Sequence, residues 1–308
     1  MIRTANLNKK YGDFMALQGV SLNVREGDIY GFIGPNGAGK TTTIKILTTL
    51  LEPTGGDATV CGLSVWDNKE QIRGLIGYMP DAFGVYPDMT VTEYLHFFAA
   101  AYGIPRKERG GLVDGLLELT DLTYKEDALV DSLSKGMQQR LGLARALVHD
   151  PRVLILDEPA AGLDPRARVE LREILRELQA MGKTILLSSH ILSELQDICN
   201  RIGIVERGRL VAEGSVDEIL DQLGGAGRYS LRTTDDERAQ ALLQAHELVA
   251  SVAVDEQAAL SFEFVDAASD VALITQALAS EGIGLRHLAK ARVSLEDAFM
   301  KLTKGLVQ

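Results

Sequence analysis

The sequence has few of the features that would place a protein within a membrane or outside the cell. No apolar run reaches the roughly 20 residues that cross a bilayer, and the first residues contain no apolar signal-peptide segment. Two cysteines are present, Cys61 and Cys199, far apart in the sequence and in no metal-type spacing. We therefore expect two reduced thiols, no disulfide framework and a cytoplasmic protein.

Positive charge is also scarce. The 308 residues include 43 acidic and 32 basic residues, and the formal net charge at pH 7 is −11. Such a surface is a poor match for the phosphates of DNA or RNA, so we expect no nucleic-acid partner. The net charge does not exclude a local basic patch.

Strand-like and helix-like segments alternate from residue 1 to about residue 223. Apolar strands are expected at residues 28–33, 153–157 and 184–189, and a helix at residues 166–180. This alternation is typical of an α/β domain with a mainly parallel sheet and helices on its faces.

A helical subdomain is expected within this α/β domain. Residues 88–147 show helical patterns and no convincing strand. Thr90 and Glu93 have the spacing of a capping box, which predicts a helix start.

The sequence beyond residue 223 has an organisation of its own. Residues 224–228 are rich in glycine and predict a linker. Residues 229–308 follow the order β-α-β-β-α-β, which predicts a small α+β domain of the ferredoxin-like type, and residues 295–302 predict a last helix. This part contains 12 acidic and 7 basic residues, so we expect it to bind neither nucleic acid nor anionic lipid.

The strongest chemical signal is the glycine-rich loop from Gly34 to Thr41. Its sequence, GPNGAGKT, fits G-x-x-x-x-G-K-[ST] and lies between a strand-like and a helix-like segment. Glycines let successive backbone N–H groups surround an anion, and the N-terminus of the following helix adds partial positive charge. Lys40 is expected to reach the outer phosphates, and the Thr41 hydroxyl to bind Mg²⁺. The loop therefore predicts a nucleoside triphosphate site.

Two carboxylates follow the apolar strand that begins at residue 153. Asp157 is placed to hold Mg²⁺ through a water, and Glu158 to take a proton from an attacking water. A buried parallel strand that happens to end in two acids would have the same sequence, so these residues alone leave both interpretations open.

The segment from Leu133 to Arg140 predicts a second anion site. Ser134 and Gly136 stand at the start of an amphipathic helix, where a hydroxyl, backbone N–H groups and the helix dipole favour an anion. An ordinary N-cap would explain Ser134, but not the whole octet.

Together these motifs resemble the nucleotide-binding subunit of an ABC transporter. Gly34–Thr41 matches the Walker A motif, Val153–Glu158 matches Walker B with its catalytic glutamate, and Leu133–Gln138 resembles the LSGGQ signature, with Lys135 and Met137 as departures. Ala161–Asp164 resembles the D-loop, His190 the switch histidine, and Tyr11 the aromatic residue that stacks on adenine. Residues 295–299 resemble the C-terminal extension of ATPases that serve ABC-2-type exporters.

The resemblance implies a P-loop NTPase that hydrolyses ATP as a head-to-tail dimer with a second copy or a similar ATPase. ATP would lie between Walker A of one subunit and the signature of the other, with Glu158 and His190 as catalytic residues. The residues implied to contact ATP are Tyr11, Gly34, Pro35, Asn36, Gly37, Ala38, Gly39, Lys40, Thr41, Thr42, Ser134, Lys135, Gly136, Gln138 and Asp164.

One position departs from the family pattern. Where the family usually has glutamine, after the strand-like residues 76–80, this sequence has Asp81. An ionised aspartate accepts hydrogen bonds but donates none, and its oxygens are good ligands for Mg²⁺. We therefore expect Thr41, Asp81 and Asp157 to bind the metal.

The resemblance also implies membrane-embedded permease subunits that export a substrate, with the ATPase lying peripherally on the inner face of the cell membrane. Aromatic residues gather within residues 82–102, and we expect the permease to dock there. We expect Phe97 and Phe98 to pack in the core, and Phe83, Tyr86 and Tyr94 to remain exposed.

Two other functions remain open at this stage. The first is a soluble ABC-type ATPase that acts on ribosomes or DNA, although the chain has neither a second cassette nor a long coiled-coil insertion. The second is a switch that binds ATP without turnover, although both Glu158 and His190 are present.

Overall fold

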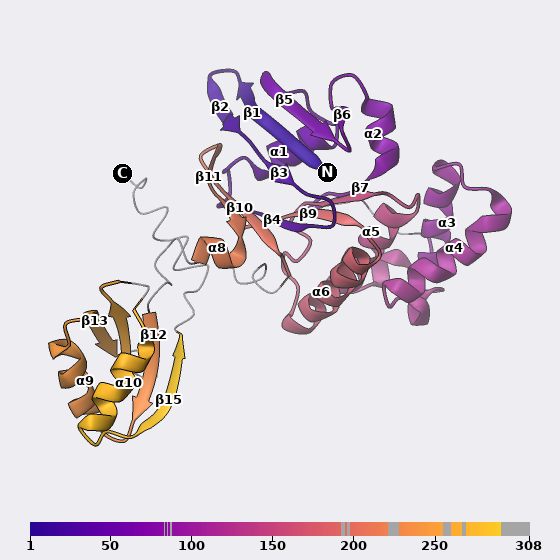
Figure 1. Ribbon diagram of the computed structural model, residues 1–308. Helices are drawn as coiled ribbons and strands as arrows, with labels where there is room; N and C mark the ends of the chain where they lie inside the picture. The colour runs from indigo at the N-terminus through magenta and orange to yellow at the C-terminus, as the bar shows by residue number, and fades with distance from the viewer. Residues whose placement is uncertain are drawn as a thin grey trace. The chain divides into compact units, whose positions relative to one another are not determined.

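The computed structural model describes residues 1–82, 84, 86, 88–191, 195, 198–220, 228–254, 260–266 and 269–290. The chain forms two compact units, Met1–Val216 and Asp217–Gln308 (Figure 1). Among the described residues, no helix combines the length and the apolar character that a bilayer crossing requires.

The first unit is built on a six-stranded sheet of order β11-β10-β4-β9-β8-β7, in which every neighbouring pair is parallel except β10 and β11. Every residue of β4, β8 and β9 is buried, as expected for parallel strands covered on both faces. These are the three strands that the sequence predicted, and they are confirmed. The strands are β4 Ile29–Ile33, β7 Ile76–Met79, β8 Val153–Leu156, β9 Thr184–Ser189, β10 Arg201–Glu206 and β11 Arg209–Ser215.

A second sheet in this unit is antiparallel and differs from the mainly parallel arrangement that we expected throughout residues 1–223. Its order is β2-β1-β5-β6, with β3 beside β1. Gly12, at φ +55°, permits a two-residue turn that pairs Tyr11 with Phe14 and folds β2 back onto β1. The strands are β1 Ile2–Tyr11, β2 Phe14–Val20, β3 Asn23–Val24, β5 Gly55–Val60 and β6 Leu63–Ser64.

The two sheets share one hydrophobic core with the first helix. Ile2 and Leu7 of β1, Ile44 of α1 (Lys40–Leu47), Phe32 of β4 and Ile155 of β8 belong to the same buried cluster. Figure 1 shows α1 between the antiparallel sheet and the larger sheet. The start of α1 is therefore fixed by packing on two sides.

Three helices occupy the region for which the sequence predicted helices. They are α3 Val91–Ala101, α4 Arg106–Leu119 and α5 Lys135–Leu147, with short 3-10 turns at Thr123–Lys125 and Val130–Ser132. The predicted capping box at α3 is confirmed: Thr90 Oγ1 accepts from the Glu93 N–H at 3.2 Å, and Glu93 Oε2 accepts from the Thr90 N–H at 2.9 Å. The first unit also contains α2 Lys69–Leu75 and α6 Pro165–Ala180, and α8 Val216–Leu220 begins at its last residue.

The prediction for the aromatic residues of α3 was wrong in two places. Tyr94, expected at the surface, is 0% exposed, and Phe97, expected in the core, is 42% exposed. The buried residues of α3 are Val91, Tyr94, Leu95 and Ala99, a stripe at i, i+3, i+4 and i+8 that leaves out Phe97. Tyr94 tolerates burial because its hydroxyl accepts a hydrogen bond from Arg145 at 3.4 Å.

The described residues of the second unit include a four-stranded antiparallel sheet of order β13-β14-β12-β15 and the helices α9 and α10. Leu231, Leu243, Phe262 and Ile274 lie in its buried core. The predicted helix at residues 295–302 and the predicted linker, apart from Arg228, lie outside the described residues. The elements are β12 Arg228–Thr233, α9 Asp236–Ala245, β13 Val249–Val254, β14 Leu260–Phe264, α10 Val271–Ser280 and β15 Leu285–Lys290.

Candidate functional site

The polar residues that the sequence singled out follow the parallel strands of the large sheet. The glycine-rich loop follows β4, Asp81 follows β7, Asp157 and Glu158 follow β8, and His190 follows β9. Because these strands are parallel, their carboxyl ends lie at one edge of the sheet. The topology thus brings together residues that are far apart in the sequence.

The loop between β4 and α1 requires glycine at several positions. Gly37 has φ +81° and Gly39 has φ +107°, values that side chains strongly disfavour. A Cβ at Gly34 would collide with the backbone oxygen of Val205. Lys40, the first residue of α1, is 5% exposed, and its Nζ donates to the Gly34 carbonyl at 2.6 Å.

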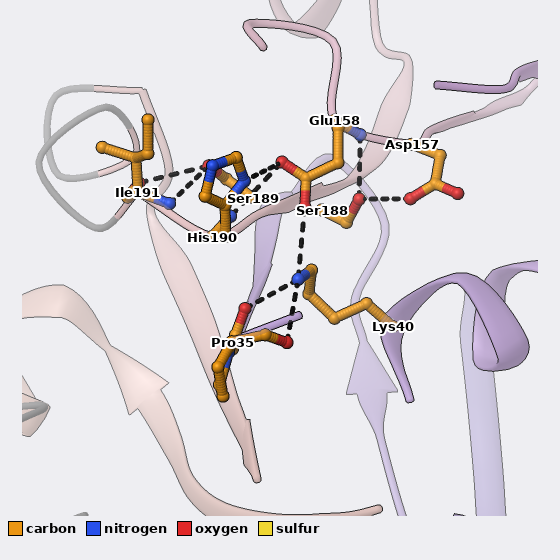
Figure 2. A network of polar contacts seen from close by, with 9 residues as sticks. Pro35, Lys40, Asp157, Glu158, Ser188, Ser189, His190 and Ile191 are labelled. Atoms are coloured by element: carbon orange, nitrogen blue, oxygen red, sulfur yellow. Dashed lines mark hydrogen bonds and ion pairs between the residues drawn. The ribbon is translucent and has the colours of Figure 1, made fainter. Parts of the chain in front are cut away.

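Glu158 connects Lys40 to His190. Its Oε1 lies 3.2 Å from Lys40 Nζ, and its Oε2 accepts hydrogen bonds from Nδ1 of His190 at 2.8 Å and from the His190 backbone N–H at 3.3 Å (Figure 2). A carboxylate only accepts, so Nδ1 carries the hydrogen and Nε2 faces away from this bond. The residues that the sequence paired as catalytic are therefore in direct contact.

Ser188 is a site residue that the sequence analysis did not assign. Its hydroxyl donates to Asp157 Oδ1 at 2.6 Å and accepts from the Glu158 N–H at 2.9 Å (Figure 2). Glu158 has φ +51°, a left-handed conformation that is uncommon outside glycine. The serine therefore holds both carboxylate residues from the neighbouring strand β9.

Asp157 is 1% exposed and lies among several polar groups. Burial raises the pKa of its carboxyl group, and repulsion from Glu158 and Asp81 acts in the same direction, whereas hydrogen bonds from Ser188 and Thr41 lower the pKa. Among the described residues, no three His, Cys, Asp or Glu side chains converge as a complete metal site. The oxygen donors near Asp157, which include Thr41 and Asp81, fit Mg²⁺, because this ion takes one or two protein ligands and completes its shell with phosphates and water.

A cavity of about 440 Å³ opens above these residues. Phe14, which the sequence analysis did not single out, lines it together with Tyr11, its partner across the β1–β2 turn. Gly34, Pro35 and Ala38 do not line it; Gly34 and Ala38 are buried, and Pro35 is exposed. Of the predicted residues, the lining includes Tyr11, Asn36, Gly37, Gly39, Lys40, Thr41, Thr42, Asp81, Glu158 and His190. Its size and its donors suit a nucleotide.

Other residues predicted to contact ATP lie in a separate cavity of about 550 Å³. Ser134, Lys135, Gly136 and Asp164 line this second cavity, and none of its lining residues belongs to the first. Ser134 caps α5 by accepting from the Met137 N–H at 3.3 Å, and Asp164 caps α6 by accepting from the Ala167 N–H at 2.8 Å. Gln138 lines neither cavity; its Nε2 donates to the Val130 carbonyl at 3.5 Å.

The cations of the second cavity differ in their partners. Arg140 pairs with Asp121 at 2.8 Å and Glu170 at 3.7 Å, and Arg166 pairs with Glu170 at 3.0 Å. Within the described part of the chain, no carboxylate lies within 4.0 Å of the Lys135 ammonium. The Lys135 side chain passes over Gly162, where a Cβ would collide with its Nζ.

Comparison with known proteins agrees with this geometry. The family model described as ABC transporter matches residues 17–161. Nod factor export ATP-binding protein I of Burkholderia orbicola (strain AU 1054) is 44% identical over 216 residues, which cover 70% of this chain and 71% of that protein. The bacitracin transport ATP-binding protein BcrA of Bacillus licheniformis is 35% identical over 306 residues, 99% of this chain and 98% of that protein.

Solved structures give the same result for the first unit. An ATP-binding subunit of an ABC transporter matches with a TM-score of 0.66 and 34% identity, covering 73% of this chain and 93% of that chain. A dimeric ATP-binding cassette in a post-hydrolysis state, bound to ADP and phosphate, matches with a TM-score of 0.64 and 27% identity, covering 70% of this chain and 99% of that chain.

These similarities confirm the predicted α/β fold, the ATPase activity and the role as the ATP-hydrolysing subunit of an exporter. They do not favour the alternatives, a ribosome- or DNA-acting ATPase and an uncoupled switch. With a glycine-rich loop, two carboxylates and a histidine assembled at one sheet edge, and with relatives that match nearly the whole chain, the protein belongs to the ABC transporter family of ATP-binding subunits.

Proposed function

We propose that the first cavity is the hydrolytic half of the ATP site, with the triphosphate on Gly34–Thr42 and the adenine on Tyr11. The contact chain Lys40–Glu158–His190 carries this assignment, because it places a cation, a base and an orienting imidazole side by side. Glu158 positions the attacking water and accepts its proton, while Nδ1–H of His190 fixes the carboxylate and Lys40 neutralises phosphate charge.

Mg²⁺ belongs to the same proposal. Asp157, fixed by Ser188, and the Thr41 hydroxyl are placed to hold the ion or its waters, and Asp81 adds a third oxygen ligand from the end of β7. When bound, the metal neutralises the negative charge of the triphosphate. The repulsion of Asp157 by Asp81 and Glu158 supports this, because a cation between these groups relieves it.

The second cavity supplies the other half of the site, from a second copy or a similar ATPase bound head to tail. Ser134 and Gly136 present the N-terminus of α5, and Lys135 adds a cation that no carboxylate of the described residues neutralises. Asp164 lines this half from the start of α6, and Gln138 stands behind it on α5, with its Nε2 on the Val130 carbonyl. Binding of ATP would then close the dimer, and hydrolysis would open it.

A permease docks, in this proposal, on the face around residues 82–102, and the ATPase then lies on the inner face of the cell membrane. A groove of about 360 Å³ on this face is lined by Tyr78, Phe98, Tyr102 and Arg145 among others. The exposed rings of Tyr86 and Phe97 stand next to each other, with centroids 5.5 Å apart. Such an aromatic groove suits a short helix of a membrane subunit.

Cargo selection is assigned to the permease. The printed names of two relatives differ in cargo, Nod factor and bacitracin, although both are similar to this chain over most of its length. If this type of subunit bound the cargo itself, proteins that serve such different cargoes would not be expected to be similar over most of their length. We therefore propose that this chain supplies the ATP-driven step and does not bind the exported compound.

The domain boundaries proposed from the sequence are residues 1–223, 224–228 and 229–308, with the helical subdomain at about residues 88–147. For the last domain we propose the ferredoxin-like fold. It is supported by the element order from β12 to β15 and by the sheet order, in which the first and third strands are central.

The ATP site is tested by titrating the purified chain with Mg-ATP and measuring phosphate release. Lys40→Ala should abolish tight ATP binding, because a buried, charge-assisted phosphate contact is lost. Lys45→Ala, one turn further along α1 and exposed, is the matched control and should bind as the parent does. Equal affinities of the parent and the Lys40 variant would contradict the proposed site.

Docking is tested by cross-linking. A gene beside the one for this chain should encode a protein with about six apolar segments of about 20 residues. With Cys61 replaced by serine, Tyr86→Cys should form disulfide adducts with cysteines placed in cytoplasmic loops of that co-expressed permease. The absence of an adduct at every loop would remove this face from the proposal.

A further inference from the structure

The turn between β10 and β11 makes hydrogen bonds to two parts of the proposed nucleotide site, the glycine-rich loop and strand β2. The Gly208 N–H donates to the Ala38 carbonyl of the glycine-rich loop at 2.9 Å. The Gly208 carbonyl accepts from the Gln18 N–H of β2 at 2.7 Å. The peptide units on either side of Gly208 therefore link the phosphate loop to strand β2 of the antiparallel sheet.

Side-chain contacts of Gln18 strengthen the link on the β2 side. Its Nε2 donates to the Arg207 carbonyl at 3.0 Å. Its Oε1 accepts from Nε of Arg209 at 3.2 Å and from Nη2 of the same arginine at 3.0 Å. The amide thus contacts the residues on both sides of Gly208.

The β10–β11 turn, strand β2 and the glycine-rich loop lie so close together that neither Gly208 nor Gly39 has room for a side chain. Gly208 has φ +75°, and a Cβ there would lie 2.5 Å from the Ala16 oxygen. From the loop side, a Cβ on Gly39 would lie 2.6 Å from Leu17 Cδ2 and 3.0 Å from the same Ala16 oxygen. Backbone atoms do not yield as the end of a flexible side chain does, so a substitution at Gly208 must displace β2 or the turn.

Strand β2 carries the base end of the cavity. Phe14 begins the strand and faces Tyr11 across the turn, and Ala16 lines the same cavity. The phosphate end belongs to the loop before α1, which has further attachments of its own: it continues from β4, and the Gly34 N–H donates to the Ser189 carbonyl at 3.3 Å. The position of β2 against the loop therefore sets the distance between the stacking rings and the phosphates.

We propose that Gly208 is a positioning residue that holds the base-stacking turn at the distance a nucleoside triphosphate requires. This inference rests on the proposed ATP site, with Tyr11 and Phe14 at the base and the glycine-rich loop at the phosphates. The turn touches neither end of the ligand; it acts through β2. Its removal should weaken recognition of the base while leaving recognition of the phosphate chain.

Calorimetric titration of the full chain with two ligands separates these effects. The ligands are ATP and inorganic tripolyphosphate, both with Mg²⁺; the second has the phosphates and no base. Gly208→Ala should weaken ATP binding about tenfold and change tripolyphosphate binding by less than about twofold. Gln18→Ala removes the side-chain contacts without backbone strain and should shift ATP binding in the same direction, about threefold.

Gly103→Ala is the matched control. Gly103 has φ +76°, almost the value at Gly208, but a Cβ there would meet nothing within 4 Å. It therefore carries the same backbone strain without the contact with β2, and its affinities for ATP and tripolyphosphate should equal those of the parent. Thermal unfolding of each variant without ligand shows that the compared proteins are folded.

Each result decides one question. If both ligands weaken equally in Gly208→Ala, the turn supports the phosphate loop and the positioning role is wrong. If neither ligand is affected in either Gly208→Ala or Gln18→Ala, the turn has no role in binding. If the parent binds tripolyphosphate but gains nothing from the base of ATP, the proposed adenine contact fails, and the inference fails with it.

Discussion

Helices α1 and α5 begin in similar ways and have different surroundings. Each has a lysine as its first residue, Lys40 or Lys135, and each start lines a cavity that we assign to ATP. Lys40 is buried and paired with Glu158 at 3.2 Å. Lys135 is exposed, and none of the described carboxylates lies within 4.0 Å of it.

In the proposed arrangement, the two helix starts supply different parts of one ATPase site. The cavity at the start of α1 is lined by Glu158, His190 and the rings of Tyr11 and Phe14, and α1 packs between two sheets. The start of α5 has the exposed Lys135 and the hydroxyl of Ser134, and neither Tyr11 nor Phe14 lines its cavity. A site made from α1 of one chain and α5 of another combines what each lacks.

The largest effect is expected at the α1 site. Glu158→Gln should lower kcat by about a hundredfold or more, because the amide neither accepts the proton of the water nor pairs with His190 Nδ1–H as a carboxylate does. ATP affinity should stay near that of the parent. Glu177→Gln, an exposed glutamate on α6, is the matched control and should hydrolyse ATP normally. Turnover by Glu158→Gln within a few-fold of the parent would disprove the assignment.

A smaller effect is expected at the α5 site. Lys135→Gln should raise the ATP concentration for half-maximal hydrolysis by about three- to tenfold, because an exposed cation contributes less than a buried one. The effect should shrink as salt is added. Lys107→Gln, an exposed lysine in the first turn of α4, should have no effect.

Gly162→Ala extends this test, because the new Cβ displaces the Lys135 ammonium. If Lys135 acts through its position on Gly162, the variant with both Lys135→Gln and Gly162→Ala should need no more ATP for half-maximal hydrolysis than the more affected single variant. Strictly additive losses would mean that the two residues act independently.

Asp81 tests whether the metal belongs to the α1 site. Asp81→Asn keeps the size of the side chain and removes its charge, so about threefold more Mg²⁺ should be needed for half-maximal hydrolysis. The readout is hydrolysis titrated with Mg²⁺ at fixed ATP, with the exposed Asp67→Asn as control. Identical Mg²⁺ curves for parent and Asp81→Asn would leave Asp81 outside the metal site.

The smallest effect concerns how α5 is anchored at its far end. His149 follows α5, stacks on Tyr102 at 4.0 Å and donates from Nε2 to the Ile76 carbonyl at 2.8 Å. Burial lowers the pKa of His149 below its usual 6.5, so the folded state favours the neutral ring. This contribution to stability is complete above the usual pKa and is lost as pH falls below it.

Replacing His149 by phenylalanine keeps the stack and removes the titrating group. The thermal midpoint of this variant should fall less than that of the parent between pH 7 and pH 5.5. His96→Phe on α3 is the control. A parent and a His149→Phe variant with the same pH slope would show that His149 does not couple protonation to stability.

Much of the α1 site was predictable because its signals are local. The loop from Gly34 to Thr41 carries its function in adjacent residues, and β4 and β8 are continuous apolar runs. The Thr90–Glu93 capping box likewise depends on four consecutive residues. Such features need no knowledge of the tertiary fold.

Residues whose role depends on a neighbouring strand were missed or misplaced. Ser188 holds Asp157 and Glu158 only because β8 and β9 are adjacent. Phe14 joins Tyr11 because the chain turns back at Gly12, which the expectation of a mainly parallel sheet did not include. Tyr94 and Phe97 exchanged their expected positions because Arg145, about fifty residues away, satisfies the buried hydroxyl.

The claim that two incomplete sites meet across two chains is tested most directly by the mass of Glu158→Gln in solution. Light scattering on this variant should give the mass of one chain without nucleotide and twice that mass with saturating Mg-ATP, because ATP is bound and not consumed. Ser134→Ala in the same background should weaken the dimer. A single-chain mass at saturating ATP, with ATP demonstrably bound, would contradict the account.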